Sequence, residues 1–196
     1  MPKRFAYYDR LSAKEKATYR KSDAIAEVVI PDVTALGVLV RTLEEALASG
    51  KRLATARAST ALVAALARQL GVRSVNVKVR NVRPEYSGGE LHGLYTFSQE
   101  GETPTIEVWM RTAANERVVR FRTFLRTLLH EVLHHLDVTL LGLDDSFHTE
   151  GFFRRESSLV RQLAPAAPAK KKPEAKPAKA KPVQLDLFGM PVKKGR

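Results

Sequence analysis

The sequence contains no cysteine among its 196 residues. Disulfide bonds, thiolate metal ligands, iron–sulfur clusters and cysteine nucleophiles are therefore excluded, so any metal ion must be held by His, Asp or Glu. Long apolar runs are also missing, because no stretch approaches the roughly 20 apolar residues that a membrane helix needs. Segment 1–22 is basic and polar, without the apolar core of a signal peptide. We therefore expect a cytoplasmic protein with no membrane partner.

Negative charge is in short supply: 21 Asp and Glu stand against 33 Lys and Arg, which gives a net charge of +12. Such an excess favours a polyanionic partner such as nucleic acid. Segment 164–196 alone carries nine basic and two acidic residues, or +7, in a sequence dominated by Lys, Pro and Ala. This composition predicts a disordered tail that binds DNA through its phosphates without reading bases, and association with the nucleoid would follow. A purely solubilising linker is the alternative.

The length favours one domain with appendages. We assign residues 1–30 to a basic N-terminal segment, 31–163 to the domain and 164–196 to the tail. Hydrophobic spacing then predicts helices over about 33–43 and 54–70, followed by strands over 75–79, 91–97 and 105–110. A long helix should begin at 116, with Asn115 as its N-cap, and end at Gly142. A last helix is predicted over 149–163. A turn at 98–103 would join the last two strands as a hairpin. This order predicts an α+β fold with a small three-stranded sheet packed against helices.

The long predicted helix contains His130-Glu131-Val132-Leu133-His134, which is an HExxH pattern. Positions i and i+4 lie one turn apart on one helix face, so both imidazoles can bind one metal ion, with Glu131 beside them as a general base. The alternative is that both histidines are core residues bonded to backbone carbonyls. The apolar surroundings and the clustering of four of the five histidines between 130 and 148 favour the metal site.

A catalytic zinc site needs a third protein ligand besides a water molecule. We predict His148, because a turn at Gly142 can fold the chain back over the metal face. Asp137 lies nearly on the face of His130, where it can hydrogen-bond an imidazole from outside the ligand set; a solvated acid is the alternative. We interpret His92 as a structural or surface residue. The rivals for the third position are Glu150, Asp137, Asp144, Asp145 and His135, of which His135 faces away from the metal.

Three segments together resemble the SprT-like zinc metalloproteases: LLHEVLHHLD at 128–137, SFHTEGFFRRESSLVRQL at 146–163 and TIEVWM at 105–110. The resemblance covers about residues 30–163 and implies a zincin-like fold around a long active-site helix. It also implies that Glu131 is the catalytic base and that Zn2+ is held by His130, His134 and His148. The segment 105–110 is placed like the family's edge strand, along which an extended protein substrate would pair. Many relatives carry a cysteine zinc ribbon after this core, and this chain has no cysteine to form one.

The tail contains one apolar island, Gln184-Leu185-Asp186-Leu187-Phe188. This pentapeptide resembles the bacterial sliding-clamp-binding motif at every position. The resemblance implies that Gln184 hydrogen-bonds at the rim of a pocket while the Leu and Phe side chains fill an apolar groove. A disordered tether suits this mode of binding, and an incidental apolar patch is the alternative.

These features predict a zinc metallopeptidase that hydrolyses proteins at DNA and is recruited through the sliding clamp. This resembles the role of SprT-like enzymes in removing proteins crosslinked to DNA. One alternative is a regulatory protease that cleaves a repressor. Another is a non-proteolytic, DNA-associated adaptor that binds the clamp and has a structural metal site, whose activity would not depend on Glu131.

Overall fold

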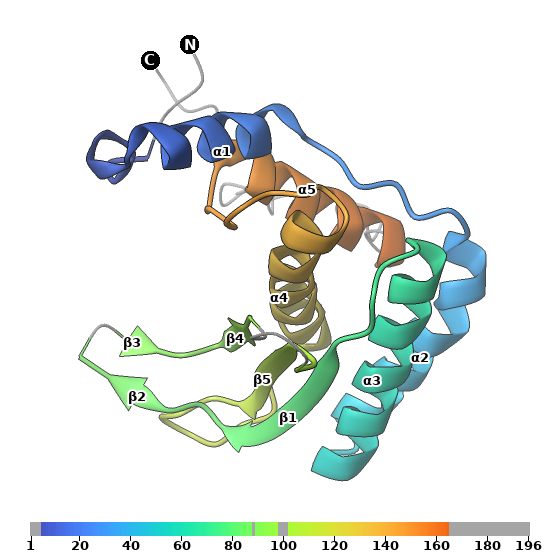
Figure 1. The fold of residues 1–196 in the computed structure, drawn as a ribbon. Helices are drawn as coiled ribbons and strands as arrows, with labels where there is room; N and C mark the ends of the chain where they lie inside the picture. The colour runs from blue at the N-terminus through green and yellow to red at the C-terminus, as the bar shows by residue number, and fades with distance from the viewer. Residues whose placement is uncertain (1–4, 88, 98–101, 165–196) are drawn as a thin grey trace, which may run out of the picture. The chain divides into compact units, whose positions relative to one another are not determined.

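Five α-helices and two small β-sheets form the part of the chain that the computed structural model describes, namely residues 5–87, 89–97 and 102–164 (Figure 1). This arrangement confirms the predicted α+β class. The elements are a 3-10 helix at Tyr8–Arg10, α1 (Ala13–Ala24), α2 (Val33–Ala48), α3 (Arg52–Gln69), β1 (Asn76–Val82), β2 (Glu85–Tyr86), β3 (Gly89–Glu90), β4 (Gly93–Thr96), β5 (Thr105–Arg111), α4 (Phe121–Thr139) and α5 (Glu150–Leu163). No helix in this set is long and apolar enough to cross a bilayer. The predicted tail after residue 164, with its motif at 184–188, lies outside the described residues.

The larger sheet has the strand order β1-β5-β4, with β5 parallel to β1 and antiparallel to β4. The pairing of β4 with β5 confirms the predicted hairpin, although 98–101 in its turn lie outside the described residues. Because β5 is central, the prediction that 105–110 forms an edge strand is wrong. Ile106, Val108 and Met110 on the inward face of β5 are fully buried, as suits a strand with neighbours on both sides. β1 and β4 are the two edge strands of this sheet, and β2 pairs separately with β3.

One apolar core lies between the sheet and the helices. α3 packs against β1, α4 packs against β4 and β5, and α2 packs on α3. Helical spacing places six buried side chains on one face of α4: Phe124, Leu125, Leu128, Leu129, Val132 and Leu136. Burial of this face fixes the rotation of α4, and the spacing puts His130 and His134 on the opposite face.

α4 begins at Phe121, so the predicted start near residue 116 with Asn115 as N-cap is wrong. Val118 forms an antiparallel bridge with the last residue of β5, and the N–H of Val119 donates to the carbonyl of Met110 at 2.9 Å. β-Branched residues favour such extended pairing over a helical turn. The apolar pattern before Phe121 therefore belongs to the end of the sheet and not to the helix.

The N-terminal segment contains a helix, α1, for which the sequence pattern gives no prediction. Ser12 and Glu15 form a capping box at its start: the Ser12 hydroxyl accepts from the N–H of Glu15 at 3.3 Å, and the Glu15 carboxylate accepts from the N–H of Ser12 at 2.7 Å. α1 packs on α5, and the chain then runs in extended form beside α5 toward α2 (Figure 1). Along this path Gln162 of α5 accepts from the N–H of Ile30 and donates to the carbonyl of Val28, both at 2.9 Å. Segment 5–30 thus packs on the helix that ends the domain.

The first prediction concerns Gly151, where α5 lies against the end of α1. A Cβ atom at this position would lie 2.5 Å from the carbonyl oxygen of Asp23 and 2.6 Å from that of Ser22. Backbone atoms cannot swing aside as a side chain can, so we expect Gly151→Ala to lower the free energy of unfolding by about 2 kcal/mol. Chemical denaturation measures this change.

Gly37→Ala in α2 is the matched control. A Cβ atom there meets only the end of the Arg41 side chain, at 3.8 Å, and alanine favours a helix over glycine. The control should therefore raise the free energy of unfolding by about 0.5–1 kcal/mol. Wild-type stability in Gly151→Ala would contradict the close packing of α1 on α5.

Candidate metal centre

Three imidazole rings meet beside the N-terminal end of α5. His130 and His134 come from consecutive turns of α4, and His148 directly precedes Thr149, whose hydroxyl caps α5 by accepting from the N–H of Phe152 at 2.9 Å. The Nε2 atom of His148 lies 2.9 Å from that of His130 and 3.2 Å from that of His134. Within the ranges that the structure describes, these histidines are the one group of three or more His, Asp or Glu side chains close enough to hold a metal ion. The structure thus brings together the three residues predicted as ligands.

The other ring nitrogen of each α4 histidine has a hydrogen-bond partner that fixes the position of the proton. Nδ1 of His130 lies 2.8 Å from a carboxylate oxygen of Glu156, which only accepts, so Nδ1 carries the hydrogen. Nδ1 of His134 lies 2.7 Å from the hydroxyl of Ser146. Because that hydroxyl donates to Asp137 at 2.8 Å, it accepts from His134. In the neutral form of both rings, Nε2 therefore has a free lone pair directed toward the meeting point.

These donors fit a zinc ion. Burial, with the neighbouring His130 and His148 charges, lowers the pKa of His134 to about 3, and burial lowers the pKa of His148, so neither ring is readily protonated. Neutral lone pairs facing one another repel unless a cation lies between them. Zn–N bonds of about 2.0–2.1 Å in tetrahedral geometry set two ligand nitrogens about 3.3 Å apart, close to the separations observed. Three nitrogen donors also leave a fourth position open, as in catalytic zinc sites.

Glu131 lies between α4 and the edge strand β4. Its side chain is buried, and a Cβ atom on Gly93 would lie 2.8 Å from its Cγ and closer still to its Oε1. The absence of a side chain at Gly93 therefore makes room for the carboxylate. Burial raises the pKa of Glu131 to about 7, against the lowering effects of charge on His130 and of a hydrogen bond from the backbone N–H of Tyr95. Such a pKa suits a group that exchanges protons near neutral pH.

Two cavities meet at His130 and Glu131, since both residues line each of them. One cavity, of about 280 Å³, also touches β4 and His148. The other, of about 350 Å³, is also lined by Glu90, His92, Arg126 and Glu156. His92 is thus a cavity-lining residue that does not belong to the histidine group. Glu131 is therefore bordered by both cavities.

The other candidate ligands have different partners. His135 faces away from the three rings, as its position on the helix predicts: its Nδ1 lies 3.1 Å from the Tyr95 hydroxyl and its Nε2 lies 2.9 Å from the carbonyl oxygen of Arg73. Asp145 accepts from the N–H of Ser146 at 2.7 Å. Asp144 and Glu150 form ion pairs, Asp144 with Lys14 at 3.3 Å and Glu150 with Arg154 at 2.6 Å.

Asp137 is fully buried and reaches an imidazole only through a hydroxyl. One carboxylate oxygen pairs with Arg155 at 2.9 Å, and the other accepts from Ser146, which is bonded to His134. The predicted hydrogen bond between Asp137 and an imidazole is therefore indirect, through Ser146, and full burial contradicts the alternative of a solvated acid. The sequence pattern fails here because it does not show that Ser146 lies between the two side chains.

Glu156 is a site residue that the sequence reasoning missed. It accepts from His130 and also pairs with Arg126 at 2.7 Å, which leaves no carboxylate oxygen without a partner. A signal for it exists in the sequence, since Phe152 and Glu156 are spaced four residues apart in the predicted helix, and this spacing places both side chains on one helix face. Phe152 packs against all three histidine rings, with centroid distances of 4.9–5.1 Å.

No protein-family model, curated protein or solved structure matches this chain.

The second prediction concerns metal content. Purified wild-type protein should hold about one zinc ion per chain, because three converging nitrogens complete a site that two helical imidazoles leave weak. His148→Ala should lose most of this zinc, measured by elemental analysis after dialysis against buffered zinc. Glu150→Ala is the control, since its carboxylate pairs with Arg154 and should leave the zinc content unchanged. Full zinc in His148→Ala with loss in Glu150→Ala would show that an acid is the third ligand.

Proposed function

We propose that the chain is a zinc-dependent metallopeptidase of the SprT-like type, with a zincin-like fold. The observation that carries the proposal is the convergence of three Nε2 atoms with a fourth position open and the Glu131 carboxylate on the same helix, one residue from His130. A structural zinc site would need a fourth protein ligand. Among the described residues, no other His, Asp or Glu joins the cluster.

The chain's own residues supply the acid–base chemistry of peptide hydrolysis. Zinc bound at the three nitrogens would polarise the scissile carbonyl and acidify the attacking water. Glu131 accepts a proton from that water and passes it to the leaving amine, so that the C–N bond breaks while a C–O bond forms. Without a bound cation, burial raises the pKa of Glu131 to about 7, well above that of a carboxyl group in water. Gly93 keeps the space that this carboxylate occupies.

The edge strand β4 supports a polypeptide as the substrate. β4 has β5 on one side, and among the described residues no strand of the same sheet lies on the other. An extended peptide that pairs with a free edge uses backbone hydrogen bonds, so recognition of its sequence is loose. β4 takes the role that the sequence pattern assigns to 105–110. Its exposed Leu94 side chain lines the same cavity as Glu131, where it would contact such a peptide.

The proposed site of action is protein bound or crosslinked to DNA. Support comes from the tail sequence, whose net charge of +7 suits non-specific phosphate contacts and whose island at 184–188 matches the clamp-binding pattern. A flexible tether raises the local concentration of the peptidase near its target without requiring a tight contact. Recruitment through the sliding clamp would thus bring a peptidase of loose specificity to replicating or repaired DNA.

The third prediction tests the general base. Glu131→Gln should keep its zinc, because Glu131 is not among the converging ligands, and should lose peptidase activity by several orders of magnitude. Cleavage of an unfolded protein substrate, followed by gel electrophoresis and paired with zinc analysis, measures both properties. Wild-type cleavage by Glu131→Gln would contradict the peptidase proposal and favour an adaptor with a structural metal.

A second variant, Gly93→Ala in β4, displaces the same carboxylate. In Gly93→Ala the new methyl group would occupy the space of the Glu131 side chain, so the carboxylate must move while the three histidines stay in place. Activity should fall and zinc content should stay at the wild-type level. Loss of zinc in Gly93→Ala would show that the change disturbs the ligands themselves and not the base alone.

The fourth prediction concerns the clamp. A peptide spanning residues 181–192 should bind purified bacterial sliding clamp with a dissociation constant of about a micromolar, because ordering a flexible peptide offsets several kcal/mol of contact energy. Combined replacement of Leu187 and Phe188 by Ala should abolish binding, measured by fluorescence anisotropy. Met190→Ala, outside the pentapeptide, is the control and should bind as the parent peptide does. Absence of binding at high micromolar clamp would show that the island is incidental.

A further inference from the structure

Arg155 forms an ion pair inside the protein, away from solvent. Its side chain and that of Asp137 are both fully buried, with Nη2 2.9 Å from Oδ1. Removing two charges from water is costly, and apolar replacements of such pairs are often neutral or stabilising. Stability alone therefore does not account for a buried Arg155–Asp137 pair at this position.

The Asp137 side of the pair leads to the metal centre. Oδ1 faces Arg155, whereas Oδ2 accepts from the hydroxyl of Ser146 at 2.8 Å. With its hydrogen committed to Asp137, this hydroxyl accepts from Nδ1 of His134 at 2.7 Å. The direction of these successive hydrogen bonds thus leaves the lone pair of His134 on Nε2. A neutral Asp137 would leave the guanidinium, which is always charged, without its anionic partner.

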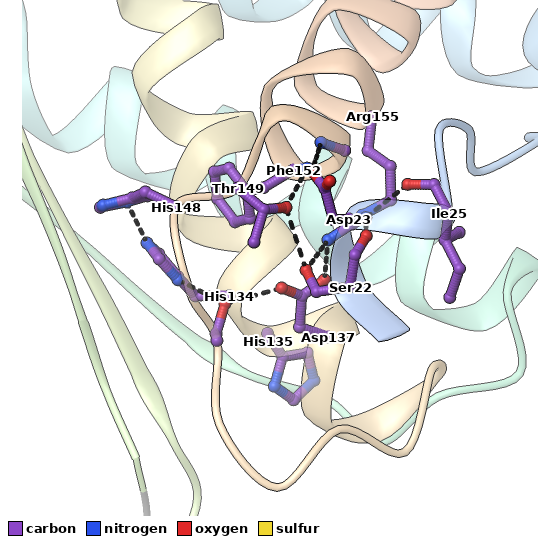
Figure 2. A network of polar contacts seen from close by, with 12 residues as sticks. Ser22, Asp23, Ile25, His134, His135, Asp137, His148, Thr149, Phe152 and Arg155 are labelled. Carbon is purple, nitrogen blue, oxygen red and sulfur yellow. Dashed lines mark hydrogen bonds and ion pairs between the residues drawn. The ribbon is translucent and has the colours of Figure 1, made fainter. Parts of the chain in front are cut away.

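The Arg155 side of the pair leads to α1. Nη1 donates to the carbonyl oxygens of Ser22, at 2.6 Å, and Ile25, at 2.5 Å, while Nη2 donates to the Ser22 hydroxyl at 3.0 Å. Carbonyls at the C-terminal end of a helix lack partners within the helix and attract a cation. Figure 2 shows the guanidinium between this end of α1 and Asp137. The end of α1, a helix far from α4 in the sequence, therefore fixes the position of Arg155.

We propose that Arg155 is a positioning residue of the metal site, which orients the His134 ring and fixes its proton on Nδ1 through Asp137 and Ser146. This inference rests on the proposed zinc site and adds to it a role for the N-terminal helix. Hydrogen-bond partners outside the ligand set typically change metal affinity by about 10–100-fold. Arg155, Asp137 and Ser146 thus form a relay of hydrogen bonds that runs from α1 to His134. Interruption of any of these hydrogen bonds should weaken zinc binding.

Ser146 is the step at which the relay can be cut with least effect on the fold, because it lies in a loop and is half exposed. Ser146→Ala removes the hydroxyl and should weaken zinc binding by about 10–100-fold, measured by competition with a chelating dye. Ser146→Thr restores a hydroxyl and should recover most of the affinity. Because His134 loses its orientation, the visible absorption bands of the Co2+-loaded protein should also change in Ser146→Ala and not in Ser146→Thr.

The ion pair is tested by replacing both partners together, since removing one alone would leave a buried charge and endanger the fold. In full-length protein with Asp137→Leu and Arg155→Met, two apolar side chains of similar volume replace the ion pair. This protein should bind zinc as weakly as Ser146→Ala. Adding Ser146→Ala to this pair should cause little further loss, because all three changes interrupt one relay. Ser158→Ala is the matched control: its hydroxyl donates to Glu27 at 2.7 Å, joining α5 to the N-terminal segment without reaching His134, so zinc affinity should not change.

Three results would overturn the inference while leaving the zinc site intact. They are wild-type zinc affinity in the Asp137→Leu/Arg155→Met protein, losses that multiply when Ser146→Ala is added, and an equal loss in Ser158→Ala. Failure of the wild-type protein itself to bind zinc would instead overturn the proposed metal site, and the inference with it.

Discussion

The mutual repulsion of imidazole lone pairs is the physical constraint on which the site depends. Nε2 of His148 lies within hydrogen-bond distance of Nε2 of both His130 and His134, yet the Nδ1 partners of those two residues leave no proton on Nε2 of either neutral ring. A hydrogen on Nε2 of His148 could satisfy only one of these two lone pairs, so the arrangement is unfavourable without a cation, and the surrounding protein must hold the rings in place. The contacts around α4 therefore hold the three histidine rings in orientations that direct their Nε2 atoms toward one another.

α5 holds both helix histidines through adjacent residues. Glu156 accepts from His130, and Arg155 acts on His134 through Asp137 and Ser146. Consecutive residues on a helix point roughly 100° apart, so one helix can serve two ligands from two sides. On the same helix Phe152 packs against all three rings and keeps their surroundings apolar. The position of α5 is in turn fixed by α1 and by the extended chain that follows it.

The sequence predicts those features that depend on local spacing. His130 and His134 follow from helical periodicity alone, and the class of fold follows from the order of helical and strand patterns. The position of β5 in the centre of the sheet is a long-range property, because its parallel pairing with β1 joins segments that spacing does not connect. The start of α4 is misjudged for a related reason: Val118 fits a helical pattern but pairs with the end of β5. The relay from Ser22 to His134 crosses most of the chain, and its existence depends on how α1 packs.

The edge of the sheet and the general base occupy one space, and this links substrate binding to catalysis in the proposed enzyme. An unpaired edge strand is ordinarily a risk for aggregation, and natural proteins keep such strands short. β4 is short, with four residues, and it lies against the HExxH helix. Its backbone donates to Glu131 through the N–H of Tyr95, while Gly93 leaves room for the carboxylate. A peptide that pairs with β4 would therefore lie beside the proposed general base, because Gly93 and Tyr95 of this edge strand both border the Glu131 side chain.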